Sequence, residues 1–197
     1  FWANRQWGEK VIVVAPAKFV NTLDYENRPL DVEGTSMAGP LVTGSIANVL
    51  KITPELSRRH IELMLDKTGI PLGNNPKKTG KLKMLNSYKL VWVAQRLQEE
   101  LKNKRFKNAS ERDAFIDSQL ANPKIYDFTT AAQISLKKSK ETAFLDNCKN
   151  LAAAIKLART SLLLHPTVAA KKHLVHLYNL SGHTQNRDFY KGLTDFN

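Results

Sequence analysis

The sequence predicts an α/β fold over residues 1–95, with a parallel sheet and flanking helices, followed by an α-helical domain over residues 96–197. Three observations predict this arrangement. Val11–Val14 is an unbroken β-branched run that ends at an Ala-Pro pair, which is typical of a core strand in a parallel sheet. Met37–Leu50 is apolar or small at almost every position, as expected for a helix buried on nearly all sides. After Ala94 helix-forming residues dominate the sequence.

The helix that contains the apolar run is expected to begin near Ser36. Pro40 is acceptable only in the first turn, where its missing N–H would have no helical partner. The Ser36 hydroxyl is therefore expected at the N-terminal end of the helix, where the dipole and the free N–H groups favour negative charge. Such a serine is either a nucleophile whose own N–H stabilises an oxyanion, or part of an ordinary loop and N-cap.

Ser36 lies in the segment EGTSMAGPLVTGS, from Glu33 to Ser45. This segment resembles the nucleophile segment of the subtilisin-like serine proteases, which reads roughly G-T-S-M-A-x-P-x-V-x-G. The matching residues are Gly34, Thr35, Ser36, Met37, Ala38, Pro40, Val42 and Gly44, whereas Gly39 and Leu41 depart from the pattern. The resemblance implies that Ser36 is the catalytic nucleophile. The glycine spacing differs from the G-x-S-x-G elbow of the α/β-hydrolases, which disfavours a lipase or esterase.

The resemblance extends on both sides of the serine and covers about residues 8–95. Val11–Leu23 looks like the buried strand and the Ala-Pro turn that precede the nucleophile in this family. Thr79–Ala94 resembles the closing strand and the last helix of the catalytic domain. The implied fold is the C-terminal portion of a subtilisin-like parallel-sheet domain.

A second helix is expected between these two segments. Thr53 is the expected N-cap, Pro54 the first helical residue and Gly69 the end of the helix. His60 belongs to this helix and is expected to be partly exposed. Its position after Ser36 does not fit the family's triad, which runs Asp, His, Ser along the chain.

No histidine precedes Ser36, and the family's Asp and His motifs are absent. The resemblance therefore implies a serine endopeptidase that acts through an acyl-enzyme on Ser36, with its Asp and His supplied by a missing N-terminal part. The expected partners are a peptide or protein substrate and this N-terminal catalytic fragment of the same protein; no cofactor is expected. Two alternatives stay open. One is a pseudoprotease or scaffold whose helical tail binds a protein partner, and the other is a helical adaptor that acts through residues 110–182 alone.

The second half of the sequence indicates several amphipathic helices. Ser110 is the expected N-cap of one of them, with Asp113 in an approximate capping box, and Gly182 is expected to close another. Residues 153–182 faintly resemble a tetratricopeptide helix hairpin, although repeat arrays need about three units. A plain α-helical bundle is the favoured interpretation.

The net charge of +12 is spread over both halves, so no separate nucleic-acid arm is indicated and no nucleic-acid partner is expected. The densest basic cluster is Lys102, Lys104, Arg105 and Lys107. A solvated helix face is the favoured interpretation, with an acidic membrane surface or a phosphate backbone as alternatives. No hydrophobic run reaches the roughly 20 residues needed to span a bilayer.

Cys148 is the only cysteine, so no disulfide can form within the chain, and it is expected to be a small core residue. Four histidines lie near one another in the sequence: His165, His173, His176 and His183. No metal site is expected, because no Asp, Glu or Cys joins them at a spacing known from zinc sites. A secreted or exported bacterial protein agrees best with the resemblance.

Overall fold

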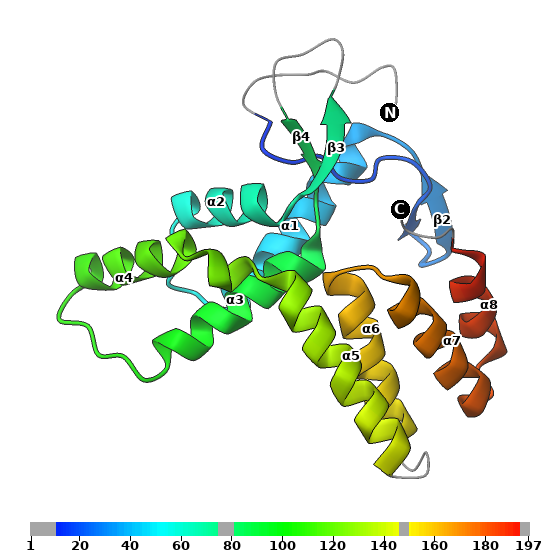
Figure 1. Cartoon of the computed structure of the whole chain (residues 1–197). Coiled ribbons are helices and arrows are strands. Elements are labelled where there is room, and N and C mark those ends of the chain that lie inside the picture. Colours follow the sequence, from blue (N-terminus) through cyan, green and yellow to red (C-terminus); the bar gives the residue numbers. More distant parts are fainter. Residues whose placement is uncertain (1–10, 75–80, 146–149, 194–197) are drawn as a thin grey trace. The chain divides into compact units, whose positions relative to one another are not determined.

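The computed structural model describes residues 11–74, 81–145 and 150–193. Within these ranges the chain is mostly helical, with eight α-helices, one short 3-10 helix and two small two-stranded sheets (Figure 1). The chain divides into two compact units, the first ending at Tyr126 and the second beginning at Asp127. The boundary expected after residue 95 lies inside helix α3 (Ser87–Leu101).

The expected α/β fold with a subtilisin-like parallel sheet is wrong. The sheets are two antiparallel pairs, β1 (Val20–Leu23) with β2 (Pro29–Val32) and β3 (Ile70–Asn74) with β4 (Lys81–Met84). Each pair is local in the sequence, whereas a parallel sheet requires strands joined by long crossover connections. The described residues contain no such set of strands.

The β-branched run Val11–Val14 does not form the expected core strand. Only Val14 is paired, in a single parallel bridge with Met84. The bridge contains two hydrogen bonds, from Val14 N to the Lys83 carbonyl at 2.9 Å and from Leu85 N to the Val14 carbonyl at 2.7 Å. The strand propensity of Val11–Val14 is not enough to form a core strand, because the described residues provide one bridging partner and no paired strands on both sides of the segment.

Helix α1 (Thr35–Ile52) begins beside Ser36, as predicted. The expected burial on nearly all sides is wrong, because Ser45 and Val49 are its only buried residues and Leu41 is 38% exposed. The buried side of α1 faces α3, where Ser45 Oγ lies 2.6 Å from Ser87 Oγ. Since no parallel sheet within the described part of the chain covers the other sides of α1, its apolar and small residues remain accessible.

Helix α2 (Arg58–Thr68) begins later than the sequence suggests. Its N-cap is Ser57, and the expected cap Thr53 is fully buried with its hydroxyl donating to the Ala94 carbonyl at 3.0 Å. This hydrogen bond uses the Thr53 side chain to connect the end of α1 to α3. Gly69 follows the last residue of α2, which confirms the predicted end of the helix.

The core of the first unit lies among α1, α2, α3, α4 (Ala109–Ala121) and the 3-10 helix η1 (Pro123–Tyr126). Its largest fully buried apolar side chains are Val49, Met64, Leu90, Val93, Leu97, Ile116 and Leu120. Helix α4 is capped by Asn108, whose side-chain oxygen accepts the N–H of Glu111 at 2.8 Å. The expected cap Ser110 therefore lies inside the helix.

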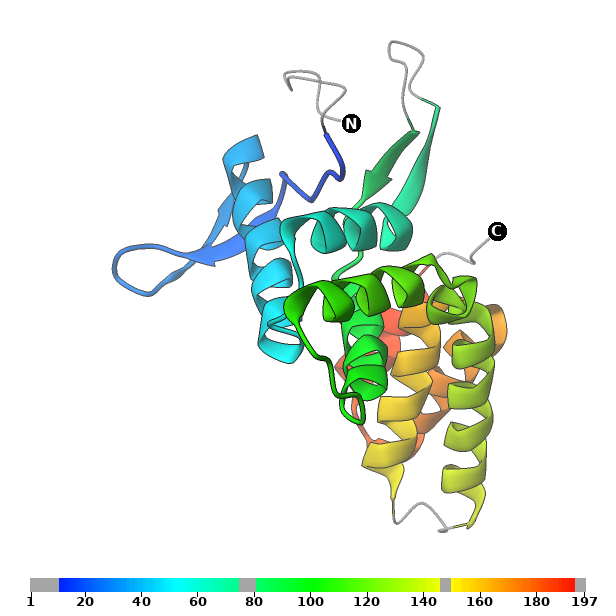
Figure 2. The same cartoon turned by 90° about the vertical axis from the view of Figure 1, so that its left-hand side faces the viewer.

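The second unit consists of α5 (Phe128–Leu145), α6 (Leu151–Leu164), α7 (Val168–Ser181) and α8 (Thr184–Gly192), each packed against the next along the chain. Figures 1 and 2 show α5 and α6 side by side as an antiparallel pair. The buried core of this unit comes from α6 and α7 and contains Ala154, Ala158, Leu162, Ala170, Leu174, Leu177 and Tyr178, with Leu136 and Ala143 of α5 packed against it. Gly182 ends α7 at a left-handed φ of 73°, as expected of the residue predicted to close this helix. No helix within the described ranges has the length and hydropathy needed to cross a membrane.

Gly69→Ala is expected to lower the free energy of unfolding by about 1–3 kcal/mol, because overpacking forces neighbouring atoms apart. A Cβ at this position would lie 2.7 Å from Lys83 Cβ and 3.2 Å from the Leu65 carbonyl oxygen. Urea denaturation followed by circular dichroism measures the effect. Gly44→Ala is the matched control, since nothing lies within 4 Å of its added Cβ. Alanine should stabilise this helix interior by up to about 1 kcal/mol. Equal changes in the free energy of unfolding for the two substitutions would contradict the close packing of Gly69 against Lys83 and Leu65.

Candidate functional site

Ser36 is an exposed residue in the first turn of α1. The N-cap of this helix is Gly34, so no side chain caps its free N–H groups. Across the described ranges neither the hydroxyl nor the backbone N–H of Ser36 has a hydrogen-bond partner. A free N–H at the positive end of the helix dipole favours an anion next to this hydroxyl.

Gly34 determines how the chain enters the helix. Its φ of 145° is a conformation that glycine adopts readily and other residues rarely do, and an added Cβ would lie 3.2 Å from Ser36 Oγ. The Gly34 N–H donates to the Ala17 carbonyl at 2.8 Å, and Lys18 pairs with Glu33 at 3.8 Å. Contacts with the segment after the Ala-Pro pair therefore hold Ser36 in place, and the absence of a Cβ leaves room for its hydroxyl.

The hairpin formed by β1 and β2 leads directly to this turn and projects from the helices of the first unit (Figure 2). The Asp24 carboxylate holds its tip together, accepting the N–H groups of Glu26 and Arg28 at 2.8 and 3.0 Å. The hydrogen bond from the Arg28 backbone is the main cause that lowers the pKa of Asp24. Tyr25, next to this carboxylate, is 90% exposed. The hairpin is thus an ordered element with an open surface.

Pro40 affects the same turn from within the helix. The sequence predicts that Pro40 lies in the first turn of the helix, but in the structure it lies farther inside α1. Because proline has no N–H, it cannot donate to the Ser36 carbonyl four residues earlier. The Ser36 peptide is therefore held less firmly than a peptide in an uninterrupted helix.

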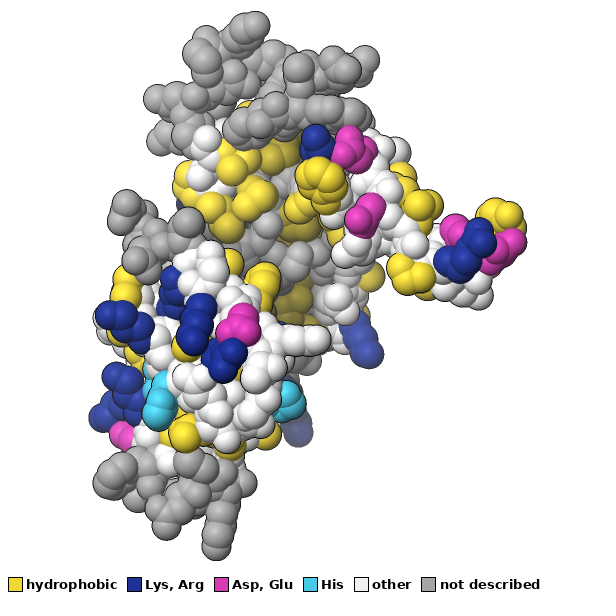
Figure 3. Space-filling view, turned by 90° about the vertical axis from the view of Figure 1, so that its right-hand side faces the viewer, with side chains coloured by type: hydrophobic (Ala, Val, Ile, Leu, Met, Phe, Trp, Pro, Cys, Tyr) yellow, Lys and Arg dark blue, Asp and Glu magenta, His cyan; other side chains and the backbone are white. Residues whose placement is uncertain are grey.

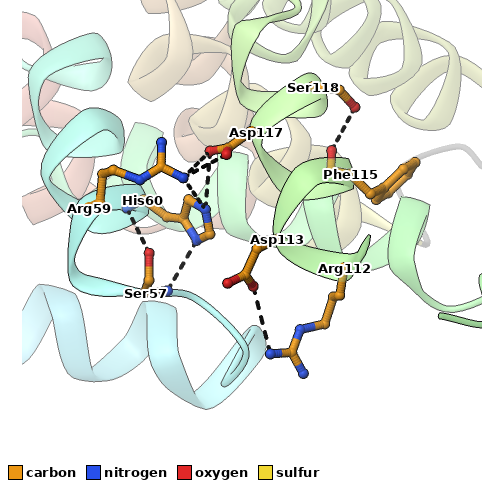
Figure 4. Close-up of polar contacts among 8 residues, drawn as sticks. All are labelled: Ser57, Arg59, His60, Arg112, Asp113, Phe115, Asp117 and Ser118. Carbon is orange, nitrogen blue, oxygen red and sulfur yellow. Dashed lines mark hydrogen bonds and ion pairs between the residues drawn. The ribbon is translucent and has the colours of Figure 1, made fainter. Parts of the chain in front are cut away.

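His60 is the centre of a second polar cluster, which the sequence did not predict (Figure 4). Its ring is completely buried, so the expectation of a partly exposed residue is wrong. The ring Nδ1 accepts the N–H of Ser57 at 3.1 Å, and Ser57 Oγ accepts the N–H of His60 at 3.4 Å. These reciprocal bonds form a capping box at the start of α2, with histidine in the place usually taken by Glu or Gln.

Asp117 from α4 completes this cluster. Its Oδ1 lies 3.2 Å from His60 Nε2, and Arg59 Nη2 donates to both carboxylate oxygens at 2.7 and 2.6 Å. Because Nδ1 is an acceptor, the neutral ring carries its proton on Nε2 and donates it to Asp117. The hydrogen bond from Arg59 is the main cause that lowers the pKa of Asp117 below 3.8. The contacts of Asp117 with His60 and Arg59 therefore connect α4 to α2.

This constellation of serine, histidine and aspartate is not a catalytic triad. The backbone N–H of Ser57 occupies the one lone pair with which the His60 ring could accept a proton. The Ser57 hydroxyl contacts the backbone N–H of His60 and not its ring. The spacing Ser57-x-x-His60 is the sequence signal that, read as a capping box, would have indicated this structural role.

His173 joins three helices of the second unit. Its Nε2 lies 3.0 Å from Ser139 Oγ, which donates to the Ala154 carbonyl at 2.7 Å. The hydroxyl gives its only proton to the carbonyl, so the ring donates to the hydroxyl from Nε2. Burial is the main cause that lowers the pKa of His173 below 6.5, followed by the charges of Lys140 and His176.

The remaining sequence candidates contribute little to a site. The described ranges contain no group of three or more His, Cys, Asp or Glu residues able to hold a metal ion, and Cys148 lies outside the described residues. The basic cluster Lys102, Lys104, Arg105 and Lys107 is exposed. Lys104 Nζ lies 5.5 Å from the centre of the Phe115 ring, a cation–π distance.

His60→Ala is expected to lower the free energy of unfolding by about 2–5 kcal/mol. The substitution removes the capping box, empties a buried volume and breaks the connection to Asp117. Chemical denaturation in urea measures the loss. Arg58→Ala is the control, because this neighbouring side chain is 91% exposed and its i,i+4 pair with Glu62 is screened by solvent. Similar losses in both variants would contradict the assigned role of His60.

The stability of the chain is expected to fall as the pH decreases below about 6.5, the ordinary pKa of histidine. Folding lowers the pKa of His173, so the unfolded chain binds this proton more tightly and acid favours unfolding. Denaturation at several pH values measures the dependence. His173→Gln keeps a donor for Ser139 and should reduce the slope, whereas the exposed control His165→Gln should leave it unchanged. An unchanged slope in His173→Gln would contradict this assignment.

Ser36, the catalytic residue that the sequence predicts, is accessible in the structure. No histidine or carboxylate among the described residues forms a hydrogen bond with its hydroxyl. Comparison with known protein families, with curated proteins and with solved structures found no match to this chain.

Proposed function

We propose that this chain carries the nucleophile of a serine endopeptidase, Ser36, which cleaves peptide bonds through an acyl-enzyme. The observation that carries the proposal is a hydroxyl and a backbone N–H at the uncapped start of α1, neither of which has a hydrogen-bond partner among the described residues. The resemblance of Glu33–Ser45 to the subtilisin-like nucleophile segment supports the same chemistry. The proposal concerns this chemistry and not the parallel-sheet fold, which the described residues do not form.

In this reaction Ser36 Oγ attacks the carbonyl carbon of the scissile bond while a histidine takes the hydroxyl proton. The Ser36 N–H donates to the oxyanion that forms, and the positive end of α1 stabilises its charge. The histidine then returns the proton to the leaving amine, which leaves an ester on Ser36. Water activated by the same histidine hydrolyses the ester and releases the second product.

The base and the aspartate that orients it are proposed to come from the N-terminal catalytic fragment of the same protein, by analogy with the order of the family's triad. His60 is unsuited to this role because both of its ring nitrogens are engaged. The side of α1 that continues from Ser36 offers this fragment a surface beside the nucleophile, since Pro40, Thr43 and Ala47 are exposed there.

A scaffold that binds a protein partner through its helices is the second candidate function. The specific observation in its favour is a set of large apolar side chains exposed on all four helices of the second unit. They are Ile134 (49%), Leu163 (44%), Val168 (37%), Leu180 (50%) and Phe189 (62%). Exposed apolar residues in such number favour a binding role, although single ones are common on protein surfaces.

Fluorophosphonate labelling of the natural gene product tests the catalytic proposal. Peptide mapping is expected to find the label on Ser36, and Ser36→Ala should abolish it. Gly34→Ala should slow labelling by about tenfold or more, because its Cβ would crowd the hydroxyl and its φ is unfavourable for alanine. The exposed Ser110→Ala is the matched control and should label normally. Absence of label in the folded protein would contradict the proposal and favour the scaffold.

A further inference from the structure

The hydrogen bonds of the β1–β2 hairpin show which of its backbone groups point away from the ladder. The Asp24 N–H donates to the Arg28 carbonyl at 3.0 Å and closes the ladder beside the turn. Hydrogen-bonded and non-hydrogen-bonded pairs alternate along an antiparallel ladder. The next pair, Leu23 with Pro29, therefore directs its backbone groups outward, which agrees with the missing N–H of proline.

The same alternation directs the backbone of Asn21 outward, because Asn21 lies two residues before Leu23 and opposite Asp31. The side chains of Asn21 and Asp31 are joined by a hydrogen bond, as expected of a non-hydrogen-bonded backbone pair, in which side chains lie closer together. Among the described residues no other strand lies beside β1, and neither Asn21 nor Leu23 has a further backbone partner. The free edge of β1 thus offers the N–H and the carbonyl of both residues.

The two edges of the hairpin differ in how they are protected. β2 contains Pro29, which has no N–H, and the charged Asp31. Proline and charged side chains are common means by which proteins prevent pairing at an edge strand. The sequence of β1 is Val-Asn-Thr-Leu, without proline or charge. The hairpin is therefore protected on its β2 edge and open on its β1 edge.

Large apolar side chains accompany the open edge. Leu23 on β1 and Tyr25 just after it are exposed, and Phe19 just before β1 is 73% exposed. Phe19 also has a φ of 54°, a conformation that bulky residues rarely adopt. Because this strained residue is not buried in a core, its conformation favours a role in contacts with another molecule.

The charge of the hairpin indicates the chemistry of its partner. Residues 18–33 contain the acidic residues Asp24, Glu26, Asp31 and Glu33 and the basic residues Lys18 and Arg28, whereas the whole chain has a net charge of +12. Both basic side chains are already paired with carboxylates of the hairpin, Lys18 at 3.8 Å and Arg28 at 2.8 Å. In the space-filling view the hairpin projects to the right, with acidic side chains around a basic one near its tip (Figure 3). A cationic partner complements this surface.

We propose that the free edge of β1 binds an extended, positively charged peptide segment of a protein partner, which adds to the hairpin as a third strand. Main-chain hydrogen bonds to Asn21 and Leu23 supply affinity, and side chains of the segment supply specificity. A second copy of the hairpin is a poorer occupant, because two negatively charged hairpins repel each other. The interaction goes beyond the peptidase chemistry and does not require a reactive Ser36.

Fluorescence anisotropy of a dye-labelled peptide, titrated with the full chain, tests the proposal. The probe is a capped peptide of alternating lysine and valine, about eight residues long, which as a strand is longer than β1. We expect saturable binding that weakens about tenfold or more when glutamate replaces the lysines, or when the backbone nitrogens of the peptide are methylated. Ser36→Ala should bind the peptide as tightly as the unchanged chain, which separates this surface from the proposed catalysis.

Leu23→Pro is expected to weaken peptide binding about tenfold or more. The substitution removes an outward N–H and places a ring on the free edge, while the ladder with β2 keeps its hydrogen bonds. Leu23→Thr is the matched control, because threonine keeps the N–H and favours strands, and it should weaken binding about threefold or less. Equal weakening by both variants would contradict main-chain pairing.

Amide hydrogen exchange of the unchanged chain, followed by NMR, locates the bound peptide without any substitution. The peptide should slow exchange of the Asn21 and Leu23 N–H groups about tenfold or more and leave that of Asp31, on the opposite edge, unchanged. Absence of saturable binding, or equal protection of Asp31, would overturn the proposal. A dimer in analytical ultracentrifugation that Leu23→Pro dissociates would also overturn it, because this result assigns the edge to a second copy.

Discussion

Burial of the His60 ring with every hydrogen bond satisfied is the constraint on which the first unit depends. A buried imidazole with an unpaired nitrogen is costly, so each ring nitrogen needs a partner in a fixed position. Ser57 supplies one partner by starting α2, and Asp117 supplies the other by bringing α4 alongside. The apolar core fills the space among the helices thus held. The interior of this unit is therefore organised by polar contacts as well as by hydrophobic burial.

Features set by neighbouring residues could be predicted from the sequence, whereas features set by distant contacts could not. The start of α1 beside Ser36 and the end of α7 at Gly182 follow from helix-start and glycine signals within a few residues. Thr53 and Ser57 are both good N-caps, and burial of Thr53 against α3 decided between them. Val11–Val14 has strand propensity, but strand formation required partners that the described chain does not provide.

The same distinction applies to the candidate site. Ser36 and its preceding glycine were found from a contiguous pattern, because a nucleophile at a helix start is encoded locally. Asp117 was missed because it lies far from His60 in the sequence, and no local pattern connects the two. The environment of His173 was equally hidden, since it is assembled from α5, α6 and α7. The charges that surround His173 are therefore determined by the folded arrangement of these helices.

Pro40 has a consequence for the energetics of α1. The missing N–H removes one rung of the hydrogen-bond ladder between the Ser36 carbonyl and the body of the helix. Local opening of the first turn therefore breaks one bond fewer than opening of an equally long turn farther along α1. Fraying can thus reach Ser36 while the rest of α1 stays folded against α3. Opening of the turn that bears the reactive hydroxyl therefore costs less than opening of the part of the helix that packs on α3.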